Sequence, residues 1–297
     1  MSAEVAQRID PQAQLEGRSL WVDAWRTLRQ NKAAMIGGIM IAFMAVLVIV
    51  GPWFSGYAYD FTDWANSSIG PSLETGHLFG TDTLGRDLFV RTLYGGRISL
   101  LVGLVATLVS LVIGITYGAT AGYIGGRLDH TMMRIVDILY AMPFMFFVIL
   151  LMVFFGRNIV LIFVAIGAIN WLDMARIVRG QTLSLKHREF VEAAQAQGVT
   201  TFAIIRRHIV PNLLGVVAVY VTLTIPQVIL VESFLSFLGL GVQEPMTSWG
   251  ALVKQGAEEM ESAPWMLLFP AVFLAGTLFC FNFVGDGLRD ALDPKDR

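Results

Sequence analysis

The sequence predicts an all-α integral membrane protein that crosses the bilayer six times. Composition and patterning both lead to this class. Of the 297 residues, 55% are hydrophobic and 15% are charged, and the mean hydropathy is +0.64, whereas about a quarter of the residues in soluble domains are charged. Six apolar segments follow one another, each about long enough to cross a bilayer as a helix. The formal net charge of −2 gives no indication of a nucleic-acid partner.

The chain divides into a polar N-terminal segment and a long apolar region. Residues 1–32 are expected to form a cytoplasmic tail, in which apolar residues recur at helical spacing from Ser19 onward. This pattern predicts a helix that lies in the membrane interface or packs on another subunit. The first apolar run begins after Lys32 and is long enough to span, so we expect no cleavable signal peptide. The predicted spans cover residues 33–53, 98–124, 136–155, 158–175, 212–240 and 264–285.

The positive charges predict the orientation of these spans, because Lys and Arg concentrate on the cytoplasmic side of membrane proteins. With the N-terminus inside, 16 of the 21 Lys and Arg residues fall on the cytoplasmic side and 5 fall outside. Both termini are therefore expected in the cytoplasm. The same topology makes residues 54–97 a periplasmic loop, with a short helix after Asp82 along the outer face. It places residues 176–211 in the cytoplasm.

The cytoplasmic loop 176–211 is expected to contain two short helices. The first covers residues 185–197, with Ser184 as its N-cap and Gly198 as the left-handed residue that ends it. The second begins after Thr200 and ends before Pro211, because the residue that precedes a proline disfavours helix.

On the first of these helices, small and apolar side chains gather on one face beside two carboxylates. These residues are Phe190, Val191, Ala193 and Ala194, with Glu189 and Glu192 on the adjacent flank. Small side chains beside one aromatic ring form a shape that can enter a groove on another protein. The periodicity equally allows an amphipathic connector that lies on the lipid headgroups, so it leaves both interpretations open.

The sequence lacks the common motifs of catalysis and cofactor binding. It contains no phosphate loop for ATP, no His-Glu-x-x-His zinc motif and no Gly-x-Ser-x-Gly nucleophile motif. We therefore predict no catalytic residue, no metal site and no cofactor in this chain. The single Cys280 excludes an internal disulfide.

Acidic residues in or beside the predicted spans are candidates for function, because charges are costly there. Asp137 and Asp173 border the cytoplasmic side, where pairing with nearby arginines is the expected role. Glu232 lies deeper, where it could face a solvated path or a partner subunit, and we take it, together with Gln227, as a candidate for a substrate path. The outer loop 242–263 is also acidic. It could contact a soluble partner or a cationic solute, and a merely solvated surface explains each of its residues equally well.

The cytoplasmic loop carries a spaced motif that resembles one known family. Integral permease subunits of ATP-binding-cassette importers have Glu-Ala-Ala, three residues, Gly, nine residues, then Ile-x-Leu-Pro in such a loop. Here Glu192, Ala193, Ala194, Gly198 and Pro211 stand at that spacing. The sequence departs from the pattern with His208 in place of Ile and Val210 in place of Leu. Further stretches at 81–87, 94–99, 236–241 and 285–294 resemble the C-type permeases of the oligopeptide and dipeptide group.

This resemblance implies a type I importer permease fold over residues 33–297, in a bacterial inner membrane. It implies a homologous second permease, two ATPase subunits that bind ATP and Mg²⁺, a periplasmic peptide-binding protein, and contact with lipid and a peptide substrate. The first cytoplasmic helix becomes the coupling helix, seated in a groove of an ATPase. The residues that the resemblance assigns to coupling are Glu189, Phe190, Val191, Glu192, Ala193, Ala194, Gly198, His208, Ile209 and Pro211.

Two groups of alternatives stay open at this level. Within the family, the cargo could be dipeptides, nickel or glutathione, because pore-lining residues determine it. From a different class, the chain could be a self-sufficient secondary transporter or a channel. The coupling motif favours the importer, since a proton-driven carrier needs no cytoplasmic helix that fits a partner's groove.

Overall fold

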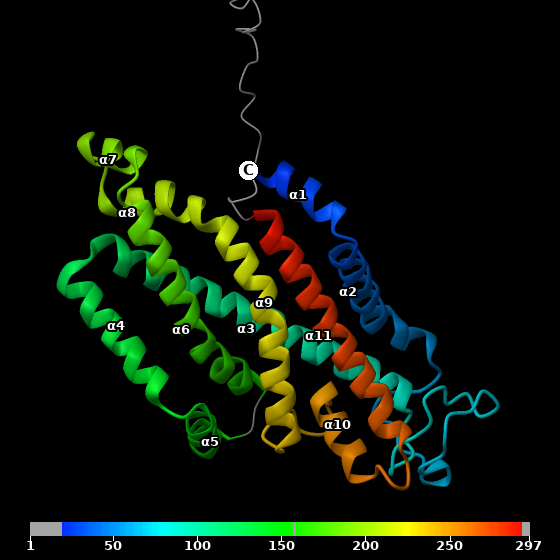
Figure 1. Cartoon of the computed structure of the whole chain (residues 1–297). Coiled ribbons are helices and arrows are strands. Elements are labelled where there is room, and N and C mark those ends of the chain that lie inside the picture. The colour runs from blue at the N-terminus through cyan, green and yellow to red at the C-terminus, as the bar shows by residue number, and fades with distance from the viewer. Residues whose placement is uncertain (1–19, 157–158, 293–297) are drawn as a thin grey trace, which may run out of the picture.

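The computed structural model describes residues 20–156 and 159–292, and Figure 1 shows their arrangement. These residues form helices and connecting loops, with one isolated antiparallel bridge between Thr81 and Asp87 as the only strand-like pairing among them. The longer helices are α1 (Leu20–Gln30), α2 (Lys32–Val50), α3 (Leu88–Ile124), α4 (Gly126–Ala141), α5 (Phe144–Phe155), α6 (Ile159–Leu185), α7 (Glu189–Ala196), α9 (Val210–Phe237), α10 (Trp249–Glu258) and α11 (Trp265–Leu292). The predicted all-α class is confirmed.

Within the described residues, four helical stretches are long and apolar enough to cross a membrane. They are Lys32–Phe54, Leu88–Ile124, Thr201–Phe237 and Trp265–Leu292, and α4 with α5 would make a fifth if that bent pair forms one span. Each of the four lies over one of the predicted segments. The fourth predicted segment, 158–175, is covered by α6 from Ile159 onward.

The second predicted segment, 98–124, lies within a longer helix. Its helix, α3, begins at Leu88 rather than at residue 98, and the expected short helix after Asp82 is the first part of α3 itself. The side chain of Asp87 caps the helix by accepting a hydrogen bond from the Val90 amide at 2.8 Å. Arg91 and Thr92 interrupt the apolar pattern but remain helical because the protein buries both of them.

The third predicted segment, 136–155, is not one helix. α4 ends at Ala141, α5 starts at Phe144, and their axes differ by 86°. Pro143 lies at the break, and Met142 before it is extended with ψ 129°. Proline has no amide hydrogen and its ring disfavours helix in the preceding residue, which favours a break at this point.

The helices in the loop 176–211 also differ from the expected boundaries. α6 continues to Leu185, so Ser184 lies in its last turn, and α7 begins only at Glu189, after Arg188. The next helix starts at Thr201 as predicted, but α8 (Thr201–Ile204) passes through a π-helical turn (Ile205–Ile209) into α9. The chain continues as helix through Pro211, which lies in the first turn of α9 directly after the π-helical turn.

Close backbone contact joins α3 to α6. A Cβ added at Gly118 would lie 2.4 Å from the Ala175 carbonyl oxygen, and one at Gly122 would lie 2.8 Å from the Arg179 carbonyl oxygen. Small residues four apart let two helices approach at backbone distance. In Figure 1, α7 and α8 lie at the same end of the molecule as α1 and the C-terminal turns of α11, while α10 and the loop before α3 lie at the opposite end.

Candidate functional site

The helix α7 is held on the body by two buried side chains. Val191 is 0% exposed and Ala194 is 5% exposed, and both belong to an apolar cluster with residues of α3, α6 and α9. The opposite face of α7 points outward and carries Glu189, Phe190 and Glu192, of which Phe190 is 42% exposed. α7 is therefore a short helix whose inner face, with Val191 and Ala194, is buried in the protein and whose outer face, with Phe190, is exposed.

Polar contacts fix the end of α7. Gln195 donates from Nε2 to the hydroxyl oxygen of Tyr123 at 3.0 Å, which links α7 to the C-terminal end of α3. The Lys186 ammonium lies 5.6 Å from the centroid of the same Tyr123 ring. Gly198 has φ +74° and ends the helix as predicted. The amide of Val199 donates back to the Ala194 carbonyl oxygen at 3.1 Å, as in a Schellman closure.

The predicted coupling residues differ in their exposure to solvent. Glu189, Phe190, Glu192, Ala193, Gly198 and Pro211 are exposed, His208 is half-buried, and Val191, Ala194 and Ile209 are buried in the chain's own core. The expectation that Val191 and Ala194 insert into a partner is corrected, because their surface is already covered by this chain. Sequence reasoning missed Phe202, which is 72% exposed beside α7. The sequence did predict a helix that begins after Thr200, and an aromatic residue in its first turn could have been recognised as a candidate for the surface.

Ion pairs join α4 to α6 near the same end. Arg179 donates to both carboxylate oxygens of Asp129, at 2.5 and 2.6 Å. Arg176 donates to Asp137 at 2.8 Å, and the Tyr140 hydroxyl donates to Asp173 at 3.2 Å. The two acidic residues at the span borders are thus engaged within the protein, Asp137 with an arginine as expected and Asp173 with a tyrosine instead.

A groove of about 530 Å³ opens between α6, α9 and α11. One face of α9 lines it from Gly215 to Gln227, and Gln181 of α6 and Arg289 of α11 complete it. Gln227, predicted for the substrate path, is exposed and lies on this groove. Glu232 does not line it.

Glu232 instead belongs to a buried polar cluster. Its side chain is 0% exposed and accepts hydrogen bonds from the hydroxyls of Ser236 at 2.7 Å and Ser99 at 3.1 Å. Ser99 also accepts the Trp249 amide at 3.2 Å, so the cluster connects α9, α3 and α10. The prediction that Glu232 faces a solvated path is corrected, because the side chain is fully buried and its oxygens find hydrogen-bond partners inside the protein.

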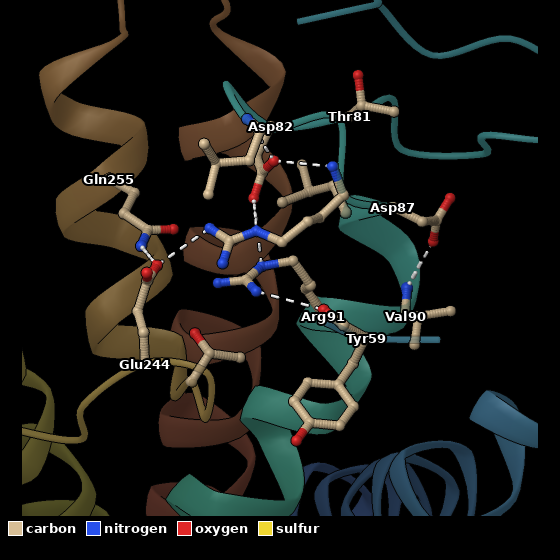
Figure 2. A network of polar contacts seen from close by, with 12 residues as sticks. Tyr59, Thr81, Asp82, Asp87, Val90, Arg91, Glu244 and Gln255 are labelled. Carbon is tan, nitrogen blue, oxygen red and sulfur yellow. Dashed lines mark hydrogen bonds and ion pairs between the residues drawn. The ribbon is translucent and has the colours of Figure 1, made fainter. Parts of the chain in front are cut away.

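A second polar network lies at the α10 end of the molecule, and Figure 2 shows it from close by. Arg86 donates to Asp82 at 2.7 Å and to Glu244 at 3.1 Å. The amide of Gln255 in α10 also donates to Glu244 at 3.1 Å. Burial favours a raised pKa for Glu244, but the hydrogen bond and positive charge of Arg86 outweigh it and hold the pKa below its usual range.

Arg91 lies beneath this network and is fully buried. It donates to the Tyr59 carbonyl oxygen at 3.3 Å, and its Nε lies 3.5 Å from the Asp82 carboxylate. The loop before α3, the start of α3 and α10 are thus fastened together by charged side chains. The sequence showed a family resemblance in the stretch 81–87 but not this network. Charges that lie close in sequence do not reveal a distant partner such as Glu244.

Comparison with known proteins now decides the family. Residues 114–297 match the profile described as "Binding-protein-dependent transport system inner membrane component", and residues 19–71 match the N-terminal transmembrane domain of oligopeptide transport permease C. The first match covers more than half of the chain. The chain belongs to this family.

Curated relatives agree along nearly the whole length of the permease. It is 61% identical over 294 residues to the oligopeptide transport system permease protein OppC of Haemophilus influenzae, which covers 99% of this chain and 94% of the relative. It is equally 61% identical over 296 residues to OppC of Escherichia coli K12, with 100% and 98% coverage. The dipeptide transport system permease protein DppC of Bacillus subtilis is 48% identical, over 93% of this chain and 86% of the relative.

A solved structure shares the fold of the permease. A chain from the inward-facing MetNI methionine ABC transporter aligns with a TM-score of 0.54 and 20% identity, and covers 69% of this chain and 96% of that chain. The type I importer permease fold expected from the resemblance is therefore present. Family membership and the apolar helices make the protein an inner-membrane component of a transport system.

Proposed function

We propose that this permease is one of two homologous membrane subunits of an ATP-driven, binding-protein-dependent importer of oligopeptides. It forms half of the translocation pore, and the second permease forms the other half. Two ATPase subunits bind below it and a periplasmic peptide-binding protein docks above it. The relatives that are 61% identical over the full chain, both named oligopeptide permeases, support this cargo.

In this proposal the chain crosses the inner membrane six times, with both termini in the cytoplasm. α2, α3, α6, α9 and α11 each supply one crossing, and α4 with α5 supplies the remaining one as a broken span. The α7 end then faces the cytoplasm and the α10 end faces the periplasm. The distribution of Lys and Arg supports this orientation.

The observation that carries the proposal is the outward face of α7. A short helix with a packed back and a free front that bears Phe190 is preformed to enter a groove without reorganising. The coupling surface that we propose consists of Glu189, Phe190, Glu192, Ala193, Gly198 and the neighbouring Phe202. Val191, Ala194 and Ile209 support it from behind. ATP and Mg²⁺ are bound by the partner ATPases, and this chain is a non-catalytic subunit.

Dipeptides, nickel and glutathione remain the alternative cargoes within the family. A dipeptide permease is 48% identical and a glutathione permease of Escherichia coli is 39% identical to this chain. OppC of Bacillus subtilis, at 49%, is hardly more similar than the dipeptide permease of the same organism, at 48%. The preference for oligopeptides therefore rests on OppC of Haemophilus influenzae and of Escherichia coli, which are 61% identical to this chain.

The test is gentle solubilisation of the tagged chain from its native membrane, followed by identification of the subunits that copurify. A second permease and ATPase subunits in a ratio of one to one to two are expected. The binding protein that stimulates the ATPase activity of this complex is then assayed for bound ligand. Recovery of the chain alone, still active in transport, would instead establish a secondary transporter or channel.

A further inference from the structure

The groove between α6, α9 and α11 has a lining that suits a peptide main chain. Polar side chains reach it from three helices: Gln181, Tyr220, Thr224, Gln227 and Arg289. The remaining lining consists of aliphatic side chains and Gly215. Amide and hydroxyl groups can bond to peptide groups of any sequence, while aliphatic walls accept varied side chains without demanding one.

The dimensions of the groove match a short extended peptide. Its lining on α9 runs from Gly215 to Gln227, which corresponds to about 18 Å at the helical rise per residue. An extended chain rises by about 3.3 Å per residue, so this length takes about five residues. The volume of about 530 Å³ lies in the range of small-molecule and peptide sites.

Charge gives the groove a direction. Arg289 is the charged side chain of the lining and lies in the last turn of α11. This turn is next to the first turns of α9, near Gly215, whereas Gln227 lies at the other end of the groove. Arg289 is exposed, and the ion pairs among the described residues do not include it. A guanidinium presents a fork of donors that fits a carboxylate. Every unmodified peptide carries one carboxylate at a fixed place, its C-terminus.

From this arrangement we infer that Arg289 binds the C-terminal carboxylate of the peptide in this groove. The peptide lies along α9 with its carboxyl end toward the cytoplasm and its amino end toward Gln227. Recognition of main chain and terminus, rather than of side chains, then explains how one groove accepts many sequences. This inference rests on the proposed function, since it assumes that peptides are the cargo.

The test measures peptide binding directly in the complete importer, reconstituted in nanodiscs without nucleotide or binding protein. The probe is a tripeptide with a central benzophenone side chain, prepared both as the free acid and as the C-terminal amide. In the wild type, photo-cross-linking to α9 should be about tenfold stronger for the acid, the factor expected for one charge-assisted contact. Arg289→Gln should reduce labelling by the acid to the level of the amide.

Two further variants make the result specific. Arg289→Lys keeps the charge and should retain most of the preference for the acid. Arg127→Gln makes the same change at an exposed arginine of α4 outside the groove and should leave the preference intact. If Arg289→Gln fails to assemble, the comparison of acid and amide in the wild type and in Arg289→Lys still decides.

Several results would overturn the inference. One is equal labelling of wild type by acid and amide, and another is cross-linking that maps outside the groove. If Arg289→Gln weakens both probes equally, and only in nanodiscs with anionic lipid, then Arg289 contacts headgroups instead. Failure of the proposed function looks different: the wild-type importer, supplied with its binding protein and ATP, would accumulate no peptide while it transported another cargo.

Discussion

At Gly198 the backbone must be left-handed to end α7, and the space in front of α7 must stay free of a long side chain. The φ angle is +74°, and a Cβ placed there would find no atom within 4 Å. An alanine would therefore cost only the strain of the left-handed conformation, about 1–2 kcal/mol. A long side chain would carry the same strain and would also project into the space in front of α7.

This difference predicts separate outcomes for two substitutions. Gly198→Ala should retain most peptide uptake, whereas Gly198→Arg should lower uptake at least tenfold while ATP hydrolysis and membrane insertion persist. Uptake per ATP hydrolysed in proteoliposomes measures the effect. Gly180→Arg is the matched control, because Gly180 of α6 also has open space around its Cβ but a normal helical backbone. Normal uptake in Gly198→Arg would refute the coupling role of this turn.

Glu244 makes part of the stability dependent on pH. Its pKa in the folded protein lies below the ordinary value of 4.5 because Arg86 outweighs the effect of burial. A carboxyl group whose pKa is lowered by folding adds stability above its unfolded pKa, and this contribution is lost as the pH falls through the folded pKa. The carboxyl group is partly exposed, so the contribution is at most about 1 kcal/mol.

Glu244→Gln should therefore lower the apparent unfolding temperature of the purified complex at pH 7. The gap between variant and wild type should close as the pH falls below about 4.5, where the wild-type carboxylate becomes protonated. Differential scanning fluorimetry across this range provides the measurement. Glu258→Gln serves as control, since the ion pair that Glu258 makes with Lys254 is long, at 3.9 Å, and exposed. A gap that stays constant with pH would contradict the role of charge at Glu244.

Among the helices, α7 is anchored to α3 as well as to the start of α9. Buried Val191 and Ala194 pack into the shared core, and Gln195 donates a hydrogen bond to the Tyr123 hydroxyl oxygen. Since α3 and α6 approach at backbone distance along Gly118 and Gly122, we expect a movement of α7 to be passed to this closely packed pair of helices.

Tyr123→Phe tests this connection without removing the aromatic ring. The lost hydrogen bond contributes about 1 kcal/mol, so uptake per ATP hydrolysed should fall about fivefold in the reconstituted importer. Tyr117→Phe removes a similar hydroxyl from α3, one that donates to the Met132 carbonyl oxygen away from α7, and should leave the ratio unchanged. Equal ratios in both variants and wild type would show that the Gln195 contact is not part of coupling.

The sequence could predict the existence of most helices but not several of their ends. The apolar pattern located α2, α9 and the start of α11 well, because these boundaries coincide with polar or turn-forming residues, but α11 continues to Leu292, past the predicted end at residue 285. The pattern did not show that α3 begins before the predicted span, since Arg91 reads as a surface residue and its burial depends on Asp82 and Tyr59. The break at Pro143 was visible as a possible kink, but its 86° angle depends on how α5 packs.

For the candidate site, the sequence identified the segment but could not separate its inner from its outer face. Four turns of periodicity distinguish two faces of a long helix, whereas α7 has only eight residues. Small residues such as Ala193 and Ala194 also fit equally well against the protein or against a partner. The role of Glu232 was misjudged because its donors, Ser99 and Ser236, are supplied by tertiary contact and by its own helix.

Considered as a whole, the molecule has a different kind of surface at each end. The α7 end presents a protruding helix, while the α10 end presents loops fastened by Arg86, Asp82 and Glu244. A fastened surface can transmit force from a docked protein into α3 and α10. The acidic turn after α10 stands on this end and is the candidate contact for the periplasmic binding protein.

Within this turn the acidic residues are not equivalent. Glu258 and Glu261 are exposed, whereas Glu259 accepts a hydrogen bond from the Ser262 hydroxyl at 2.7 Å and helps to shape the turn. Reversal of charge at Glu259 would thus change the fold as well as the charge. The informative variant is Glu258→Lys combined with Glu261→Lys.

We expect this double variant to weaken stimulation of ATPase activity by the binding protein about tenfold at low salt. The effect should shrink as salt is added, because exposed charges act mainly on the rate of association and are screened within about 10 Å at 0.1 M ionic strength. Titration of the binding protein against ATP hydrolysis in nanodiscs gives the measurement. Glu74→Lys, an exposed acid in the loop before α3, is the control for charge alone. If stimulation is unchanged in the double variant, or reduced equally in the control, the turn after α10 is not the docking contact.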